Sequence, residues 1–283
     1  MTFNDQIKND LKDTLSFKGR FSHYQELPPC VLNRLNEIDL PFDYQRAQLP
    51  LDSSRYSWII SNVDTNNLNV IDIGANLGYF SIRLASEANA NVHAYEALKE
   101  YAKSIELFSR VCDLENKLKV TQQSINLNEI LDFKNIDLTL HLNVLHHAGV
   151  FFDSERVKTT GDWYDYAVYH LRLMSNISEK IVIQIGNMWN DQLLFDSKYS
   201  IDYICDLLAK SNWDVKKIGI ITNFDDFSYD TYSVSDVDSI PRIAIWRNPS
   251  TGLVEYKDND RIIAELPSGN AQRPIFLCER REV

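Results

Sequence analysis

The feature that most constrains the fold is a short apolar run that leads into a turn bracketed by two glycines. Residues 69–73 carry the near-continuous β-branched pattern of a strand that is buried on both faces of a parallel sheet. Gly74 and Gly78 follow, and the first hundred residues contain one other glycine, Gly19. Since glycine permits unusual φ angles and lets a ligand approach the backbone, the stretch predicts a nucleotide-binding turn that opens a helix.

Two residues of this turn separate the ligand classes that use it. A dinucleotide site has the pattern G-x-G-x-x-G and holds a pyrophosphate at the helix N-terminus. Here Asn76 replaces the middle glycine, and Asp72 ends the strand. A carboxylate at that place repels a pyrophosphate but suits a ligand with an ammonium and a sulfonium group. The residues therefore predict S-adenosylmethionine as the ligand, with a dinucleotide or an unliganded turn as the alternative.

A second short strand, Asn91 to Glu96, ends in an acid 22 residues after Gly74. This is the distance at which a βαβ unit brings a carboxylate to ribose hydroxyls. Together the two segments resemble the class I S-adenosylmethionine-dependent methyltransferases, whose glycine motif matches Asp72 to Gly78 and whose ribose-binding acid matches Glu96. The resemblance implies an α/β, Rossmann-like fold with a seven-stranded, mostly parallel sheet, an antiparallel last strand and flanking helices.

The resemblance also implies a set of cofactor-binding residues. The family often has an aspartate near the adenine after the third strand, but this chain has Gln123, Ser124 and Ile125 there. Ser124 and the backbone of Ile125 are the candidates that remain. The predicted cofactor-binding residues are Asp72, Gly74, Ala75, Asn76, Gly78, Tyr79, Phe80, Glu96, Ala97, Ser124, Ile125 and Asn143.

Hydrophobic patterns predict the remaining elements of the core. A helix should present Tyr101, Ile105 and Phe108 to the sheet, and a later helix should begin with Asp162 as its N-cap. That later helix should pack through Tyr164, Val168 and Leu171, and a further helix through Ile201, Ile204, Cys205 and Leu208. Further core strands are predicted at residues 119–123, 136–142, 180–185, 215–221 and 273–280, the last of them antiparallel. Two short strand-like pieces are predicted within the insertion, at residues 242–246 and 253–256.

The acceptor chemistry is predicted at Asn143 to His147, because ligands of open α/β sheets lie beyond the carboxyl ends of the strands. This segment should emerge beside the glycine turn. A hydroxyl acceptor needs a base, and histidine suits that role near neutral pH. We favour His146 over His147 as the catalytic base; alternatively, either ring caps the strand. His141 is expected in the core and His170 as a hydrogen-bonded helix residue.

Other candidate acceptor residues come from two loops. Asn187 and Trp189, with Asn190, follow the fifth strand and can hold a polyhydroxylated acceptor; loop packing is the alternative. In the N-terminal segment Tyr24 and Arg46 are candidate substrate-binding residues; the alternative is that they only pack against the catalytic domain. Five neighbours share that prediction: Phe21, His23, Arg55, Tyr56 and Trp58.

The chain divides by pattern into an N-terminal extension or cap, residues 1–60, and a catalytic domain, residues 61–283, with an insertion at about 223–267. The insertion is expected to build acceptor specificity or an oligomer contact, and a homo-oligomer is one expected outcome. The acidic stretch 223–238 offers a partner surface, with a solvated loop as the alternative.

Composition excludes several classes of function. A net charge of -11 argues against a large nucleic-acid footprint. No apolar run is long enough to span a membrane, and no secretory signal precedes the core, so we expect a cytoplasmic protein. Four scattered cysteines, Cys30, Cys112, Cys205 and Cys278, look like apolar fillers, and no metal is predicted.

The acceptor is predicted from two further resemblances. The glycine turn and acid are similar to FkbM-type O-methyltransferases, and residues 143–147 and 182–189 are similar to methyltransferases of bacterial surface-polysaccharide assembly. These imply O-methylation of a sugar hydroxyl on a glycan or an activated sugar. The alternatives are a tRNA-modifying methyltransferase, a natural-product O-methyltransferase acting on a small molecule, and a non-catalytic cofactor-binding subunit that supports a partner.

Overall fold

The computed structural model describes residues 5–15, 25–37, 49–258 and 261–282. It divides into two compact units: residues 1–56 with 63–124, and residues 57–62 with 125–283. Within the described residues, no helix combines the length and apolar character that crossing a bilayer requires.

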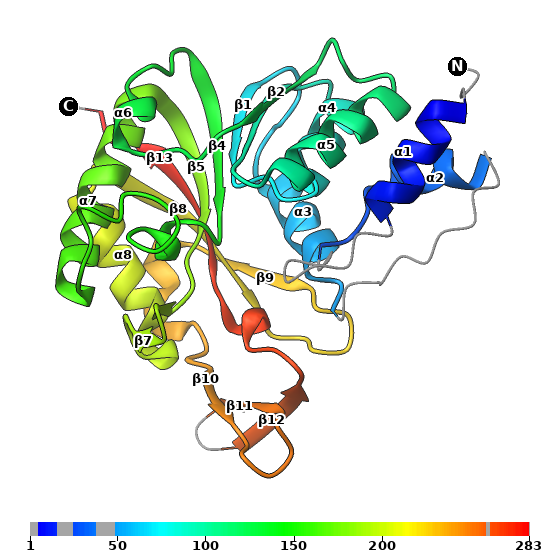
Figure 1. Ribbon diagram of the computed structural model, residues 1–283. Helices are drawn as coiled ribbons and strands as arrows, with labels where there is room; N and C mark the ends of the chain where they lie inside the picture. The colour runs from blue at the N-terminus through cyan, green and yellow to red at the C-terminus, as the bar shows by residue number, and fades with distance from the viewer. Residues whose placement is uncertain (1–4, 16–24, 38–48, 259–260, 283) are drawn as a thin grey trace. The chain divides into compact units, whose positions relative to one another are not determined.

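The first unit contains a three-stranded parallel sheet, in the order β3-β2-β1. Its strands are β1 (Asn69–Ile73), β2 (Asn91–Glu96) and β3 (Leu118–Gln122). The helices are α1 (Asp5–Leu15), α2 (Pro29–Glu37), α4 (Tyr79–Glu87) and α5 (Lys99–Val111), while α3 (Leu51–Asn62) crosses into the second unit (Figure 1). The predicted face of α5 is confirmed, because Tyr101, Ile105 and Phe108 are buried.

The large sheet of the second unit has five described strands, in the order β4-β5-β13-β8-β9. They are β4 (Ile136–Leu142), β5 (Ser178–Gln184), β13 (Ile275–Arg280), β8 (Trp213–Ile221) and β9 (Tyr229–Tyr232). β4 and β5 are parallel, and β13 inserts antiparallel between β5 and β8. The predicted antiparallel last strand is therefore confirmed, and all seven predicted core strands form in the two units.

Helices cover one side of this second sheet. They are α6 (Leu127–Ile130), α7 (Thr160–Ile177) and α8 (Ser200–Lys210), and α7 and α8 lie side by side against β5 and β8 (Figure 1). The predicted N-cap of α7 was wrong. Thr159 caps the helix by accepting from the Asp162 N–H at 3.1 Å, and Asp162 accepts in return from the Thr159 N–H at 2.9 Å.

The predicted inner face of α7 was also wrong in part. Leu171 is buried, but Tyr164 and Val168 are half-buried. The side chains that pack inward include Trp163, whose indole N–H donates to the Leu145 carbonyl at 3.1 Å. In α8 the predicted face is confirmed at Ile201, Ile204 and Leu208, while Cys205 is half-buried.

The region predicted as an insertion has more structure than its sequence indicated. β9 pairs with β8 and extends the large sheet, although its residues were read as loop. A separate antiparallel sheet follows, in the order β10-β11-β12 (Figure 1). Its strands are β10 (Ala244–Arg247), β11 (Val254–Asp258) and β12 (Arg261–Leu266), and β12 was not predicted. The fully buried Tyr256 ring anchors this small sheet.

Short elements complete the chain. A two-stranded ladder joins β6 (Met188–Trp189) to β7 (Gln192–Leu193). In the described part of the chain the 3-10 helices are η1 (Leu145–His147), η2 (Ser197–Tyr199), η3 (Val234–Ser239) and η4 (Asn270–Gln272).

Candidate functional site

The glycine turn of the first unit has the backbone that its sequence predicts. Gly74, Asn76 and Gly78 all have positive φ, at 70°, 54° and 79°. The N–H groups of Gly74 and Ala75 both donate to the Tyr95 carbonyl, at 2.8 and 3.0 Å, which ties the turn to the end of β2. At Gly78 a side chain would be strained by φ and would lie 3.0 Å from Ile105 in α5. Glycine is therefore required where α4 begins against α5.

Glu96, at the end of β2, is held by backbone donors. Its Oε2 accepts from the Asn76 N–H and its Oε1 from the Leu98 N–H, each at 2.8 Å. Burial raises the pKa of this carboxyl, and the bonded N–H groups oppose that shift. The Ala97 N–H also acts on this carboxyl. Because the two oxygens have four lone pairs between them, room remains for a further donor.

Asp72 is the second buried carboxyl of the turn, with 3% of its surface exposed. Its Oδ2 accepts from the Ser81 hydroxyl at 2.6 Å. Burial raises its pKa to about 6, and the charge of Glu96 adds to that shift. Among the described residues, no lysine or arginine compensates either carboxyl. The turn therefore presents two buried acids without a countercharge.

Asn76 carries an unused acceptor at the same turn. Its side-chain Oδ1 is buried, and no described group donates a hydrogen bond to it. A buried acceptor without a partner is unfavourable by about 1–3 kcal/mol, so the atom favours a ligand that brings a donor.

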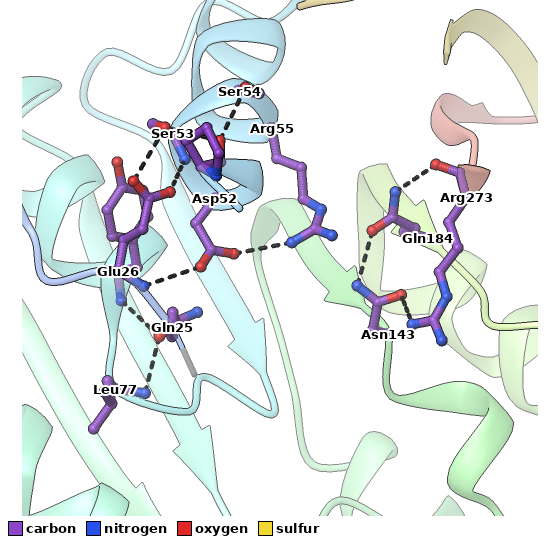
Figure 2. A network of polar contacts seen from close by, with 12 residues as sticks. Gln25, Glu26, Asp52, Ser53, Ser54, Arg55, Leu77, Asn143, Gln184 and Arg273 are labelled. Atoms are coloured by element: carbon purple, nitrogen blue, oxygen red, sulfur yellow. Dashed lines mark hydrogen bonds and ion pairs between the residues drawn. The ribbon is translucent and has the colours of Figure 1, made fainter. Parts of the chain in front are cut away.

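Gln25 was missed by the sequence analysis. Its Oε1 accepts from the N–H groups of Leu77 and Tyr79, at 3.0 and 3.3 Å, where α4 begins (Figure 2). The side chain is buried. A glutamine some fifty residues before the turn carries no sequence signal for this contact, which depends on the path of the N-terminal segment.

The other aromatic and basic candidates of the N-terminal segment have structural partners. Arg55 pairs with Asp52 at 2.9 Å (Figure 2). Tyr56 is buried beneath the Arg83 guanidinium, 3.7 Å from the ring centroid. In the second unit, Trp58 donates to the Thr231 hydroxyl at 2.9 Å. The remaining candidates, Phe21, His23, Tyr24 and Arg46, lie outside the described residues.

Five further predicted cofactor residues show different exposures. Tyr79 and Phe80 are buried in α4, and the Tyr79 hydroxyl accepts from Arg83 at 2.9 Å. Both side chains therefore pack in the unit interior. Ala97 is exposed after β2, and Ser124 is half-buried. Ile125 is buried.

In the second unit, β4 ends in a closed polar network (Figure 2). Asn143, with φ of 60°, donates from Nδ2 to Gln184 Oε1 at 2.8 Å and accepts at Oδ1 from Arg273 at 2.8 Å. Gln184 in turn donates to the Arg273 carbonyl at 2.8 Å. Arg273 and Gln184 were not predicted as site residues. The network fixes Asn143 and holds a guanidinium at the end of the strand.

His146 and His147 lie in η1, with ring centroids 4.1 Å apart. His146 is buried, and its Nδ1 accepts from the Gly186 N–H at 3.1 Å, so its ring proton is on Nε2. His147 is half-buried, and neither of its ring nitrogens bonds to a described group. Burial lowers the pKa of both rings, that of His147 to about 4, and the Arg273 charge adds to both shifts.

The loop after β5 contains the other predicted acceptor residues. Trp189 is 3% exposed, and its indole N–H donates to the Ala148 carbonyl at 2.6 Å. The Trp189 ring therefore packs within the loop, which was the alternative to a contact with the acceptor. Asn187 is half-buried and Asn190 is exposed.

His141 and His170 match their predictions as a core residue and a hydrogen-bonded helix residue. His141 and His170 are buried and face each other with Nε2 atoms 3.1 Å apart. Among the residues that the structure describes, no cluster of side chains suits a metal ion.

No family model and no curated protein matches the sequence significantly. Solved structures do match. WbdD, a bifunctional kinase-methyltransferase, aligns over 95% of this chain and 68% of its own, at 13% identity and a TM-score of 0.52. Two further examples have TM-scores below 0.5. The magnesium protoporphyrin IX methyltransferase ChlM from Synechocystis PCC 6803 covers 99% of this chain and 100% of its own, at 11% identity and 0.46. The mitomycin 7-O-methyltransferase MmcR covers 81% of this chain and 54% of its own, at 12% identity and a TM-score of 0.44.

The match to WbdD has a TM-score above 0.5, and within the second unit β13 lies antiparallel between β5 and β8. The predicted fold is thereby confirmed: the chain has the α/β, Rossmann-like fold of the class I methyltransferases.

Proposed function

We propose that this chain is an S-adenosylmethionine-dependent O-methyltransferase. The observation that carries the proposal is the pair of buried carboxyls, Asp72 and Glu96, with no cationic partner among the described residues. Buried charge of one sign is costly unless a ligand compensates it. A ligand with a sulfonium and an ammonium group supplies that compensation, whereas an anionic dinucleotide does not.

The residues of the turn fit this cofactor in a second way. S-adenosylmethionine brings hydrogen-bond donors: an ammonium, two ribose hydroxyls and an adenine amino group. Asn76 Oδ1 is a buried acceptor without a described partner, and the Glu96 carboxylate has acceptor capacity left for a further donor. Asp72, Asn76 and Glu96 would therefore hold the cofactor. Ser124 and Ile125 stay the proposed contacts to adenine, and Asn143 stays a proposed cofactor-binding residue.

The cofactor would supply an electrophilic methyl group, and the chain must then take a proton from the acceptor hydroxyl. His147 suits this step better than His146, which we favoured from sequence. The Nδ1 lone pair of His146 is engaged by Gly186, and its Nε2 carries the proton. His147 keeps a free lone pair, and its lowered pKa leaves the ring neutral at pH 7. The Arg273 charge, which acts on both rings, favours an acceptor oxygen that becomes anionic.

The proposed acceptor is a sugar hydroxyl on a glycan or activated sugar. Its support is the resemblance of residues 143–147 and 182–189 to polysaccharide methyltransferases, together with the accessible amides of Asn187 and Asn190. Trp189 is withdrawn from the acceptor site because its ring is buried. Residues 1–60 as a cap, the insertion as a specificity or oligomer element, and a cytoplasmic location remain part of this proposal.

Binding of S-adenosylmethionine and of its demethylated product, measured by calorimetry, tests the cofactor assignment. Wild type should bind both at micromolar concentration, and Asp72→Ala and Glu96→Ala should each abolish binding. Glu106→Ala removes an exposed acid of the same unit and should leave binding intact. If wild type binds neither compound, the assignment fails.

Transfer of a labelled methyl group to candidate acceptors tests the reaction itself. Sugars, tRNA and phenolic natural products should be offered in parallel, with His147→Ala as the catalytic variant. Transfer to a sugar that His147→Ala loses supports the proposal. Transfer to tRNA or a phenol would replace the sugar, and cofactor binding without transfer to any of the three would favour the partner-subunit alternative.

A further inference from the structure

Two of the four cysteines lie in contact within the first unit, although 82 positions separate them in the sequence. Cys30 is the second residue of α2, and Cys112 caps the C-terminus of α5. The two side chains act on each other where α2 packs against α5, and both are half-buried. The prediction that all four cysteines are apolar fillers therefore describes this pair poorly.

Neighbouring groups hold the two helices together at this place. Arg34 in α2 pairs at 3.0 Å with Asp113, the residue after Cys112. This ion pair lies one helical turn after Cys30, so it keeps α2 aligned with the end of α5. The contact between the thiols thus belongs to a packed helix pair.

The surroundings of Cys30 favour a thiolate. The Cys112 thiol, the Ser86 hydroxyl and the Val31 N–H lower the pKa of Cys30, while burial and the charge of Glu87 oppose that shift. A place in the first turn of a helix acts in the same direction. The other two cysteines differ: burial raises the pKa of Cys205 to about 11, and it raises that of Cys278 as well.

We propose that Cys30 and Cys112 form an oxidation site in which a hydroperoxide converts the two thiols into a disulfide. The Cys30 thiolate attacks the peroxide O–O bond, which gives a sulfenic acid and releases water or an alcohol. The Cys112 sulfur then attacks the sulfenic sulfur, the S–O bond breaks, and the oxygen leaves as water with the Cys112 proton. Two thiols are oxidised and one peroxide is reduced.

The disulfide would fix α2 to α5 and with it the segment that reaches the glycine turn. Gln25, which accepts from the Leu77 and Tyr79 N–H groups, precedes Cys30 by five residues, and Pro28 and Pro29 stiffen the chain between them. Oxidation should therefore hold Gln25 on those two amides. This consequence concerns the protein without ligand and does not depend on the proposed function.

The test treats the full-length protein with hydrogen peroxide and maps its thiols by mass spectrometry. A disulfide between Cys30 and Cys112 is expected, with Cys205 and Cys278 still reduced. Cys112→Ser should stop at a Cys30 sulfenic acid that dimedone traps, and Cys205→Ser is the matched control. Alkylation of Cys30 should be at least about tenfold faster than that of Cys205. Four free thiols after peroxide, or a disulfide that includes Cys205 or Cys278, would overturn the proposal.

Hydrogen exchange supplies a second readout that does not require a variant to fold. The Leu77 and Tyr79 amides should exchange more slowly in the oxidised protein than in the reduced protein. Equal exchange in both forms would overturn the proposed consequence for Gln25 and leave the disulfide to be judged by the thiol map.

Discussion

Replacing Asp72 by asparagine should stabilise the unliganded protein and, at the same time, weaken its binding of S-adenosylmethionine. The buried carboxyl has a pKa raised from 3.8 to about 6, chiefly by burial and secondly by the charge of Glu96. Its ionised form is therefore less favourable in the folded chain than in the unfolded chain. Asparagine keeps an oxygen that accepts from the Ser81 hydroxyl but carries no charge.

The size of the effect follows from the pKa shift. At pH 7.5 the raised pKa corresponds to a folding free-energy penalty of about 3 kcal/mol, taking about 1.4 kcal/mol per pKa unit. Because the folded-state pKa is the higher one, the penalty is fully present above the folded pKa of about 6 and vanishes below the unfolded value of 3.8. At pH 5 it should be roughly 1.5 kcal/mol. Removing the charge should also weaken cofactor binding by about 10- to 100-fold, the worth of a charged hydrogen bond.

Thermal melting of the unliganded protein at both pH values, followed by calorimetry with the cofactor, measures the two effects. Asp72→Asn should melt on the order of 5 °C above wild type at pH 7.5. The gain should shrink by about half at pH 5. The exposed-acid variant Glu106→Gln should show neither change, and Ser81→Ala should destabilise the protein because Asp72 loses its donor. A variant no more stable than wild type at pH 7.5, or a gain that does not fall with pH, would refute the reasoning.

Three predictions concern the second unit. His147→Ala should reduce methyl transfer by about 100-fold or more while cofactor affinity is kept, and unchanged transfer would remove it as base. Gly186→Ala would place a Cβ 2.9 Å from His146 Nε2, so thermal melting should show a loss of about 1–3 kcal/mol, and an unchanged midpoint would contradict the close packing. Trp189→Phe loses the bond to the Ala148 carbonyl and should cost about 1 kcal/mol without changing the acceptor KM; a raised KM would return Trp189 to the acceptor site.

The elements that the sequence predicted best are those whose residues act over short distances. The strand at 69–73, the turn at Gly74 to Gly78 and the strand at 91–96 all form as expected. Each depends on local causes: β-branched burial, positive φ at glycine and the alternation of helix and strand. Glu96 could be identified because a βαβ unit fixes the distance between the turn and the acid.

The residues that the sequence did not reveal depend on contacts between distant segments. Gln25 meets Leu77 only because the N-terminal segment returns to the turn, and Arg273 meets Asn143 across 130 positions. The preference between His146 and His147 could not be predicted either. It depends on which ring accepts from the Gly186 backbone, and two adjacent histidines give no periodic signal for that choice.

The polar groups of the glycine turn also distinguish the cofactor from a dinucleotide on physical grounds. A dinucleotide-binding turn offers its amides to a pyrophosphate and has no reason to place two uncompensated acids beside them. Here Asp72 and Glu96 are both buried, and Gln25 already occupies the Leu77 and Tyr79 amides with a neutral oxygen. A ligand carboxylate would bind those amides more strongly than the glutamine carbonyl, because charge-assisted hydrogen bonds are about twice as strong. The turn is thus suited to a ligand with cationic groups, which the buried Asp72 can neutralise, with ribose hydroxyls that donate to Glu96, and with a carboxylate that competes with Gln25. The same two acids would repel a ligand that carries a pyrophosphate, and among the described residues no cation offsets that repulsion.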